Sequence, residues 1–387
     1  MAWKTVEISS FLKERGDRFT PEEANTLDLK RIEKIDFQGK IHVIDHKPTK
    51  TNMILVKKGD LVISGINVEK GALAVYEGDE DALATIHYSS YEYDENQVDI
   101  EYLKWFLKSR TFQNIVKKQV GGGIKTELKP KKFLPVKIQL PRLDEQIGIA
   151  RKIDSVANEI DELKKINDQN EKFSIQFREE ILKEQLDNNS WNQTILKEII
   201  TDKPRNGYSP KRAEYPTKIK CLALTATTSG KFKPQYFKYV DEKIADDSYL
   251  WLKPNDILIQ RSNSIEYVGV SAIYDGEYNE YIYPDLMMKI QCSDEVDTKF
   301  LYYTLLNKST REYYRKKSKG TSNSMKKINQ KIVENTPVSI PPLTEQKRIV
   351  AKVDQLMHLC DELESNLIQS KKDSEMLMQV VLQEAFS

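Results

Sequence analysis

The chain has 387 residues, which is long enough for two or three globular domains with sizeable cores. Of these residues 39% are hydrophobic and 31% charged, a composition typical of a globular protein that is rich in charge. Lys and Arg number 60 against 59 Asp and Glu, and with this balance a nucleic-acid partner has to be bound by a local basic patch. Three scattered cysteines argue against a disulfide framework, and no run of about 18 apolar residues is present to span a membrane.

Residues 1–140 have the pattern of a mixed α and β domain. Apolar runs at 61–63 and 72–76 are bounded by glycines and predict strands, whereas residues 100–116 have the apolar spacing of a helix. Residues 136–140 alternate between apolar and polar, as in a half-buried strand. The first residues lack the apolar core of a signal peptide, so we expect a cytoplasmic protein.

The next 49 residues change character and predict one long helix. Glycine is absent between Gly148 and Gly207, and apolar residues recur at steps of four and three, which is typical of a coiled coil. We expect Asp144 to cap the start of this helix. The predicted seam consists of Ile149, Ile153, Val156, Ile160, Leu163, Phe177 and Ile181.

The second half of the chain repeats this plan. Asn255–Ile259 matches Gly59–Ile63, and Gly269–Gly276 matches Gly71–Gly78. Between these anchors the loops differ, as expected for two copies of one scaffold with different specificities. A second seam is predicted at Ile349, Val353, Leu356, Cys360, Leu363, Leu367, Leu377 and Val381. The repeat divides the chain into globular domains at 1–140 and 190–340, each followed by a long helix, at 141–189 and 341–387.

This repeat predicts an α+β fold with pseudo-two-fold symmetry. Two similar α/β domains would be separated by two long helices that form an antiparallel intramolecular coiled coil, because a domain at each end requires the helices to run in opposite directions. Asn167, Asn170 and Ser174 fall at seam positions, where a polar residue lowers stability but fixes the register. Helices that simply dimerise two chains are the alternative.

Two basic stretches that precede the long helices indicate a nucleic-acid partner. The first runs from Lys104 to Lys137 and the second from Arg311 to Lys331, and glycines interrupt both. Such elements neutralise phosphates, although one basic stretch alone would more often be an ordinary solvated face. The candidate DNA contacts are Lys47, Thr49, Lys50, Asn52, Lys117, Lys118 and Lys125 in the first half, and Arg205, Asn206, Tyr208, Lys211, Arg212, Arg261, Asn263, Lys316, Lys317, Asn323 and Lys326 in the second.

Among these candidates, Arg261 is the first choice for a contact to a base. Arginine pairs with the O6 and N7 atoms of guanine, and Arg261 ends a predicted strand beside Ser262–Ser264. The alternative for this side chain is a structural hydrogen bond to loop carbonyls.

Motifs for catalysis are missing from the sequence. An adenine methyltransferase needs an Asn/Asp-Pro-Pro-aromatic element, but Pro341-Pro342 lies between Ile340 and Leu343. A glycine-rich loop for S-adenosylmethionine and a P-loop are also missing. The four histidines show no metal-ligand spacing with the cysteines, and His42 and His46, four residues apart, fall on a predicted strand, where this spacing does not favour a zinc pair. We therefore predict no catalytic and no metal-binding residue.

The duplicated helix motif resembles a known family. Leu343–Leu356 closely resembles the characteristic helix of type I restriction-modification DNA specificity subunits, and Leu143–Leu163 looks like its partner. Gly207–Lys211 and Asp256–Arg261 resemble recurring segments of that family's target recognition domains. The resemblance covers the whole chain, although Asp36–Asn52 has no clear Gly-Tyr-Ser-like element.

This resemblance implies a non-catalytic subunit that binds double-stranded DNA. In the family, each recognition domain binds half of a split site, while the helices set the gap and hold two methyltransferase subunits. The methyltransferase uses S-adenosylmethionine to methylate adenine N6, and two restriction subunits that use ATP and magnesium can join. The resemblance implies no cofactor in this chain, no membrane, and methyltransferase contacts at Glu145, Gln146, Glu345 and Gln346.

Two other functions stay open at the level of sequence. The chain could be a nuclease or methyltransferase with a diverged site, in which case the pure protein would turn over DNA. It could also be a coiled-coil scaffold without a DNA role, in which case salt-dependent DNA binding would be missing.

Overall fold

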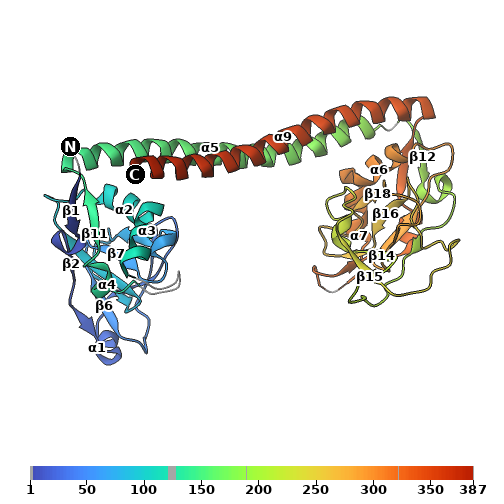
Figure 1. The fold of residues 1–387 in the computed structure, drawn as a ribbon. Helices are drawn as coiled ribbons and strands as arrows, with labels where there is room; N and C mark the ends of the chain where they lie inside the picture. The colour runs from blue at the N-terminus through green and yellow to red at the C-terminus, as the bar shows by residue number, and fades with distance from the viewer. Residues whose placement is uncertain (1–2, 121–127, 189, 321, 387) are drawn as a thin grey trace. The chain divides into compact units, whose positions relative to one another are not determined.

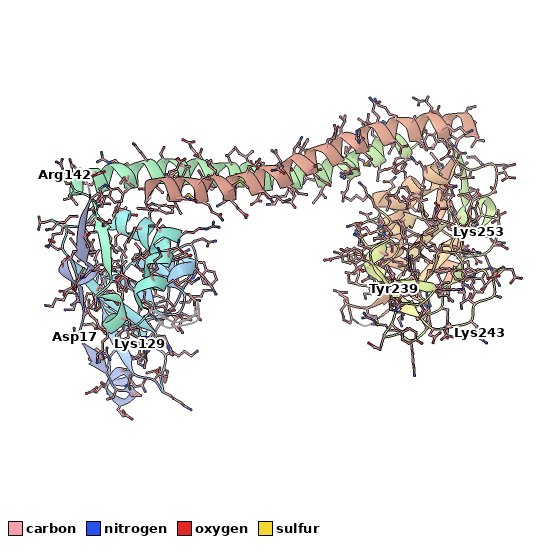
Figure 2. All side chains as sticks on the ribbon, in the orientation of Figure 1. Asp17, Lys129, Arg142, Tyr239, Lys243 and Lys253 are labelled. Atoms are coloured by element: carbon pink, nitrogen blue, oxygen red, sulfur yellow. The ribbon has the colours of Figure 1, made fainter. Side chains whose placement is uncertain are left out.

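The computed structural model describes residues 3–120, 128–188, 190–320 and 322–386. Its contacts separate the chain into two units, one made of Met1–Asp168 with Ile368–Ser387 and the other of Gln169–Leu367. Each unit therefore holds one globular domain together with parts of both long helices. Figure 2 labels Lys129 in the first unit and Lys253 in the second. Among the described residues, no helix has the length and apolar character needed to cross a membrane.

The described residues of the first domain form three sheets. Strand β1 (Lys4–Glu7) pairs antiparallel with β11 (Lys137–Leu140), next to the start of the long helix. A four-stranded sheet has the order β2 (Leu12–Glu14), β10 (Tyr88–Tyr93), β7 (Leu61–Ser64), β8 (Leu73–Val75). A five-stranded sheet has the order β3 (Arg18–Phe19), β6 (Met53–Val56), β9 (Ala82–Thr85), β4 (Lys30–Ile35), β5 (Ile41–Ile44). The helices are α1 (Pro21–Thr26), α2 (Ile100–Lys108), α3 (Arg110–Val120) and α4 (Pro130–Phe133).

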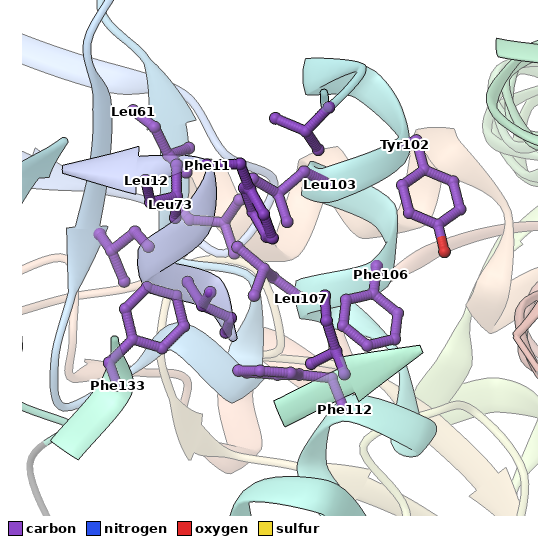
Figure 3. Close-up of a cluster of buried hydrophobic side chains, with 14 of the residues drawn as sticks. Phe11, Leu12, Leu61, Leu73, Tyr102, Leu103, Phe106, Leu107, Phe112 and Phe133 are labelled. Carbon is purple, nitrogen blue, oxygen red and sulfur yellow. The ribbon is translucent and has the colours of Figure 1, made fainter. Parts of the chain in front are cut away.

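Helix α2 provides the central apolar face of the first domain. Asp99 caps it, because its carboxylate accepts a hydrogen bond from the backbone N–H of Tyr102 at 2.8 Å. Leu103, Phe106 and Leu107 follow helical spacing and are buried in one cluster with residues of β7 and β8 (Figure 3). Each such side chain contributes about 1.5–3 kcal/mol when it is removed from water. This core fixes α2, and through it the adjoining basic helix α3.

The second domain has the same plan. Strand β12 (Asn192–Ile195) pairs with β22 (Pro337–Ile340) in the same way as β1 pairs with β11. A four-stranded sheet has the order β13 (Arg205–Asn206), β20 (Met287–Ile290), β16 (Ile257–Gln260), β18 (Ser271–Ile273). A three-stranded sheet has the order β15 (Phe237–Val240), β14 (Ile219–Leu222), β19 (Tyr281–Ile282). A two-stranded sheet pairs β17 (Ser262–Asn263) with β21 (Lys326–Lys327). The helices are α6 (Thr298–Leu306), α7 (Lys308–Lys317) and α8 (Gln330–Glu334).

A turn found in both domains confirms the internal repeat. Gly59 has φ +89° and Asn255 has φ +72°, a left-handed conformation that glycine and asparagine adopt more readily than other residues. Each precedes a buried aspartate, Asp60 or Asp256. Each of these carboxylates accepts a hydrogen bond, at 2.9 Å, from the backbone N–H three residues earlier. The two domains therefore share this turn as well as the strand order of their four-stranded sheets.

The long helices are α5 (Leu143–Leu186) and α9 (Leu343–Ala385), and in each unit a segment of α9 lies alongside a segment of α5 (Figure 1). In the first unit, Asn167 Nδ2 donates to Ser370 Oγ at 3.0 Å. In the second unit, Arg178 pairs with Asp361 at 2.6 Å. Residue numbers fall along α9 as they rise along α5, so the predicted antiparallel intramolecular coiled coil is confirmed.

The buried seam differs in part from the predicted one. Leu163, Phe177 and Leu377 were expected in the seam, but they are 44%, 40% and 47% exposed, so these three predictions are wrong. Val156, Leu356 and Leu363 are half-buried at the seam, and the fully buried positions recur every seven residues. They are Ile153, Ile160, Asn167, Ser174 and Ile181 on α5, and Val353, Cys360, Leu367 and Ser374 on α9.

Candidate nucleic-acid interface

A loop at residues 207–212 follows strand β13 in the second unit. At Gly207 the backbone passes so close to the next segment that a Cβ atom would lie 2.1 Å from Tyr283 O and 2.5 Å from Pro284 O. The N–H of Tyr208 donates to Tyr283 O at 2.9 Å. Only glycine fits this crossing, and the crossing leaves the side chains of Tyr208, Lys211 and Arg212 exposed.

Asp285 joins this loop to Arg261. Ser209 Oγ donates to the Asp285 carboxylate, and the N–H of Asp285 donates to Ser209 Oγ at 3.1 Å. Arg261 donates from Nη1 to the carbonyl oxygen of Asp285 at 3.1 Å, while its Nε is buried without a hydrogen-bond partner among the described residues. The structural role considered as the alternative for Arg261 is therefore present, and contact with a base stays a prediction.

A second loop group, formed by β17 and β21, lies next to Arg261. The register pairs Asn263 with Lys326, and the N–H of Ile265 donates to Asn323 O at 2.9 Å. Asn263 uses both ends of its amide inside the protein, since Nδ2 donates to Gln260 and Oδ1 accepts from the N–H of Ser264. The structure thus brings the predicted residues Arg261, Asn263, Asn323 and Lys326 together, but Asn263 acts here as a structural link.

The basic stretches divide into exposed and buried cations. Lys316 and Lys317 in the last turn of α7 are exposed, as are Lys117 and Lys118 in the last turn of α3. Arg311 is buried, and it donates to the carbonyl oxygens of Val268 at 2.7 Å and Glu266 at 2.9 Å. Burial lowers the pKa of Arg311 to about 10. This arginine therefore supports the loop after β17. Arg311 lies three residues before the buried Tyr314, on the same face of α7, and this spacing could have indicated its burial from the sequence.

The candidates of the first unit lie on the segment between β5 and β6. Lys47, Lys50 and Asn52 are exposed, and Thr49 is half-buried. Asn25 of α1 holds this segment, because its Oδ1 accepts from the N–H of Thr49 at 2.8 Å and its Nδ2 donates to Thr49 O at 3.1 Å. Lys125 lies outside the described residues, so its predicted contact is not addressed.

The two glutamines of the repeated helix motif are fully buried. Gln146 accepts from the N–H of Asp99 at 2.9 Å and donates to the carbonyls of Gln97 and Pro141. Gln346 makes the equivalent three bonds in the second unit. This burial speaks against partner contacts through the two glutamine side chains. Their neighbours stay candidates, since Glu145 and Glu345 bind only Trp3 and Arg348 in the described structure and remain partly accessible.

Within the described residues, no group of three or more His, Cys, Asp or Glu side chains is placed to hold a metal ion. Residues 184–370 match the family model of the type I restriction modification DNA specificity domain. The chain carries a DNA specificity domain of type I restriction-modification systems. This finding confirms the resemblance indicated by the repeated helix motif.

Relatives of the specificity domain support the same assignment. The chain is 24% identical over 299 residues to the type I restriction enzyme EcoKI specificity subunit of Escherichia coli K12, covering 74% of this chain and 64% of that protein. It is 24% identical over 306 residues to the StySPI specificity subunit of Salmonella potsdam, covering 76% and 66%. The matched part is therefore just under two thirds of the length of these curated relatives.

Solved structures share the fold. A chain from a structure described as the basis of complex assembly and conformational transition of the type I R-M system has a TM-score of 0.78 at 18% identity, covering 100% of this chain and 97% of that one. The HsdS subunit from Thermoanaerobacter tengcongensis has a TM-score of 0.62 at 18% identity, covering 100% and 96%. The α+β class with two similar domains and long helices is thus confirmed.

Proposed function

We propose that this chain is the non-catalytic DNA-recognition subunit of a type I restriction-modification complex. The main support is the match of residues 184–370 to the specificity domain, on a unit whose fold the first half of the chain repeats. Each domain would bind one half of a bipartite DNA site. S-adenosylmethionine would belong to the partner methyltransferase, and ATP and magnesium to a restriction subunit.

Adenine methylation mapped across the genome of a host that carries the chain and its methyltransferase tests this proposal. The expected result is methylation at one split site with two unlike halves, and its loss when the chain is deleted. Methylation that persists without the chain would contradict the proposal. Turnover of DNA by the purified chain alone would favour an enzyme instead.

The long helices carry a surface suited to methyltransferase subunits. Phe173 and Phe177 on α5 are 57% and 40% exposed, with ring centroids 5.7 Å apart, and Leu359 on α9 is 52% exposed in the same unit. In the first unit, Ile368 and Met376 are 57% and 63% exposed. Apolar side chains on a helix pair that buries one residue per heptad favour packing against further helices. We therefore propose that methyltransferase helices cover them.

Equivalent grooves at the helix starts extend this proposed contact. A groove of about 640 Å³ in the first unit is lined by Trp3, Pro141 and Glu145. A groove of about 730 Å³ in the second unit is lined by Trp191 and Pro341. Because each unit has an equivalent groove, the chain could bind two copies of one partner, one methyltransferase subunit per unit.

Replacing Phe173 and Phe177 with Gln tests the partner surface. Co-purification of the methyltransferase is expected to fall at least tenfold, because the partner would lose two aromatic anchors worth about 1.5–3 kcal/mol each when buried. The urea midpoint of the isolated chain should change little, since both rings are already exposed. Tyr278→Gln is the matched control, because Tyr278 is 67% exposed and lies in the loop between β18 and β19, not on a long helix. Undiminished co-purification would exclude this surface.

A further inference from the structure

A small cavity in the second unit is lined mainly by charged residues. It has a volume of about 230 Å³ and is bounded by the start of β13, the loop at residues 247–249 and one edge of β20. Its cations are Lys203, Arg205, Lys253 and Lys289, and its acids are Asp202 and Asp247. This volume is below the roughly 300–1,000 Å³ of pockets for drug-sized ligands, so the cavity suits a small group.

The first unit neutralises its equivalent buried aspartate with an arginine. There, Arg15 binds the buried Asp60 with two hydrogen bonds, from Nε at 2.6 Å and Nη2 at 2.7 Å. Ser90 of β10 adds a third bond to Asp60 at 2.7 Å. The guanidinium of Arg15 is committed to this carboxylate and to Glu92, at 2.8 Å, and its side chain is only 12% exposed.

In the second unit a different residue neutralises the equivalent aspartate. Ser90 pairs with Val62 and Lys289 pairs with Leu258, each two residues beyond the buried aspartate, so Lys289 takes the place of Ser90. Lys289 Nζ lies 3.2 Å from Asp256 Oδ2. Burial lowers the pKa of Lys289, and Asp256 opposes that effect. The positive charge that a buried carboxylate needs thus comes from β20.

This exchange releases Arg205. Arg205 pairs with Lys289 in the sheet, as Arg15 lies beside Ser90, so the two arginines occupy equivalent positions. Among the described residues, the carboxylate nearest to Arg205 is that of Asp202, at 3.8 Å. The guanidinium of Arg205 lies 5.1 Å from the ring centroid of Tyr249. Its side chain is 43% exposed. Stacking on Tyr249 holds the guanidinium at the cavity wall while leaving its N–H groups available.

The charge of the cavity fits a phosphodiester. Lys289 is balanced by Asp256, which leaves Lys203, Arg205 and Lys253 against Asp202 and Asp247, a net of one positive charge. In the described structure, Lys203 and Lys253 are exposed and form no ion pair. Arginine with nearby lysines is the usual donor set for phosphate oxygens.

We propose that this cavity binds one phosphate group of the DNA backbone. The proposal rests on the proposed function and deepens it, because Arg205 starts the strand that leads into the loop at residues 207–212. At about 3.3 Å per residue, Arg205 and Tyr208 are roughly 10 Å apart, so a phosphate held here positions the DNA beside that loop. In the first unit the equivalent arginine, Arg15, is already bound to Asp60 and Glu92, so it is not free to hold a phosphate.

The test compares salt dependence of DNA binding by the full chain and three variants. Arg205→Gln and Lys253→Gln remove cavity cations, while Lys243→Gln removes an exposed lysine that does not line the cavity (Figure 2). Each cavity variant should lower the slope of log affinity against log salt by about 0.9, so that it loses about 3.5-fold less affinity between 50 and 200 mM salt. Preference among DNA sequences should stay unchanged, and Lys243→Gln should keep the wild-type slope.

Other outcomes would overturn the proposal. Wild-type slopes for both cavity variants would exclude a phosphate contact. A changed sequence preference of Arg205→Gln at an unchanged slope would make Arg205 a contact to a base. Calorimetry with inorganic phosphate separates the two phosphate sources, because binding that Arg205→Gln abolishes, without any change in the DNA slope, would assign the cavity to a free anion. If the wild-type chain bound no DNA, the proposed function would fail first. If the wild-type chain binds DNA and the cavity variants bind it with the same salt dependence, only the phosphate site is refuted and the proposed function stands.

Discussion

At the scale of single residues, the repeated glutamine has a role that its position in a motif did not reveal. Sequence reasoning placed both helix starts to within two residues, although α5 begins at Leu143 and Asp144 lies in its first turn, not at the cap position as expected. It also interpreted Gln146 and Gln346 as partner contacts. Both side chains instead tie the first turn of a long helix to the residue that caps a helix of the preceding domain. Gln146 binds Asp99, the cap of α2, and Gln346 binds Asp297, the cap of α6. A repeated polar residue has the same sequence signature whether it binds a partner or satisfies buried backbone groups, so only the fold distinguishes the two roles.

Gln346→Ala should destabilise the second unit by about 3 kcal/mol. The substitution leaves the N–H of Asp297 and the carbonyls of Glu295 and Pro341 without their partner, and each unsatisfied buried group costs about 1–3 kcal/mol. Urea unfolding of the full chain measures this loss. Gln355→Ala, on the exposed face of α9, should shift the midpoint by less than about 0.5 kcal/mol. A similar small shift for Gln346→Ala would show that the three bonds are dispensable.

Gly207→Ala should impair DNA binding more than stability. A Cβ atom 2.1 Å from Tyr283 O forces the backbone apart at the base of the loop that carries Tyr208 and Lys211. We expect at least a tenfold loss of affinity for specific DNA in a fluorescence titration. Gly148→Ala is the contrasting variant, because nothing lies within 4 Å of the added methyl group on α5. It should stabilise the chain by about 1 kcal/mol and leave DNA affinity unchanged.

At the scale of elements, the seam shows what periodicity can and cannot predict. Steps of four and three located both helices and identified Asn167, Asn170 and Ser174 as polar seam positions; Asn167 and Ser174 are buried, and Asn170 is half-buried. Periodicity also placed Leu163 and Phe177 in the seam, although they face outward. An apolar residue fits the pattern equally well whether its partner is the other helix or a different subunit, so hydrophobic spacing alone cannot separate the two surfaces.

Asp361 should make the helix pair of the second unit sensitive to acid. Burial raises its pKa, but hydrogen bonds from Lys231 and Arg178 outweigh that effect and leave the pKa lowered. Because the folded pKa lies below the unfolded value of about 3.9, the stabilisation is complete above that value and is lost as the pH falls through the folded pKa. In urea titrations, wild type should therefore exceed Asp361→Asn in stability at pH 6, and the difference should shrink toward pH 3. A difference that is independent of pH would refute this assignment.

At the scale of the whole molecule, the sequence predicted the repeat better than the surfaces it carries. The anchors Gly59–Ile63 and Asn255–Ile259 form equivalent strands, because buried apolar runs bounded by turn residues are local signals. The link through Asp285, the buried Arg311 and the exchange of Arg15 for Lys289 depend on residues far apart in the chain. Such long-range polar pairings have no periodic signal, so candidate DNA contacts could be chosen by residue type only.

If the length of helix between the recognition domains sets the gap in the DNA site, paired insertions should lengthen that gap. Seven residues added after Asn167 in α5 and seven before Ile368 in α9 preserve the seven-residue spacing of the buried seam. Each insertion adds about 10.5 Å of helix, which corresponds to roughly three base pairs at 3.4 Å each. Methylation mapping should then find the same two half-sites with a gap about three base pairs longer. The same insertion in α5 alone is the control, because it moves Asn167 out of register with Ser370 and should reduce methylation at every site. An unchanged gap in the doubly extended chain would mean that the helices link the domains without measuring the distance between half-sites.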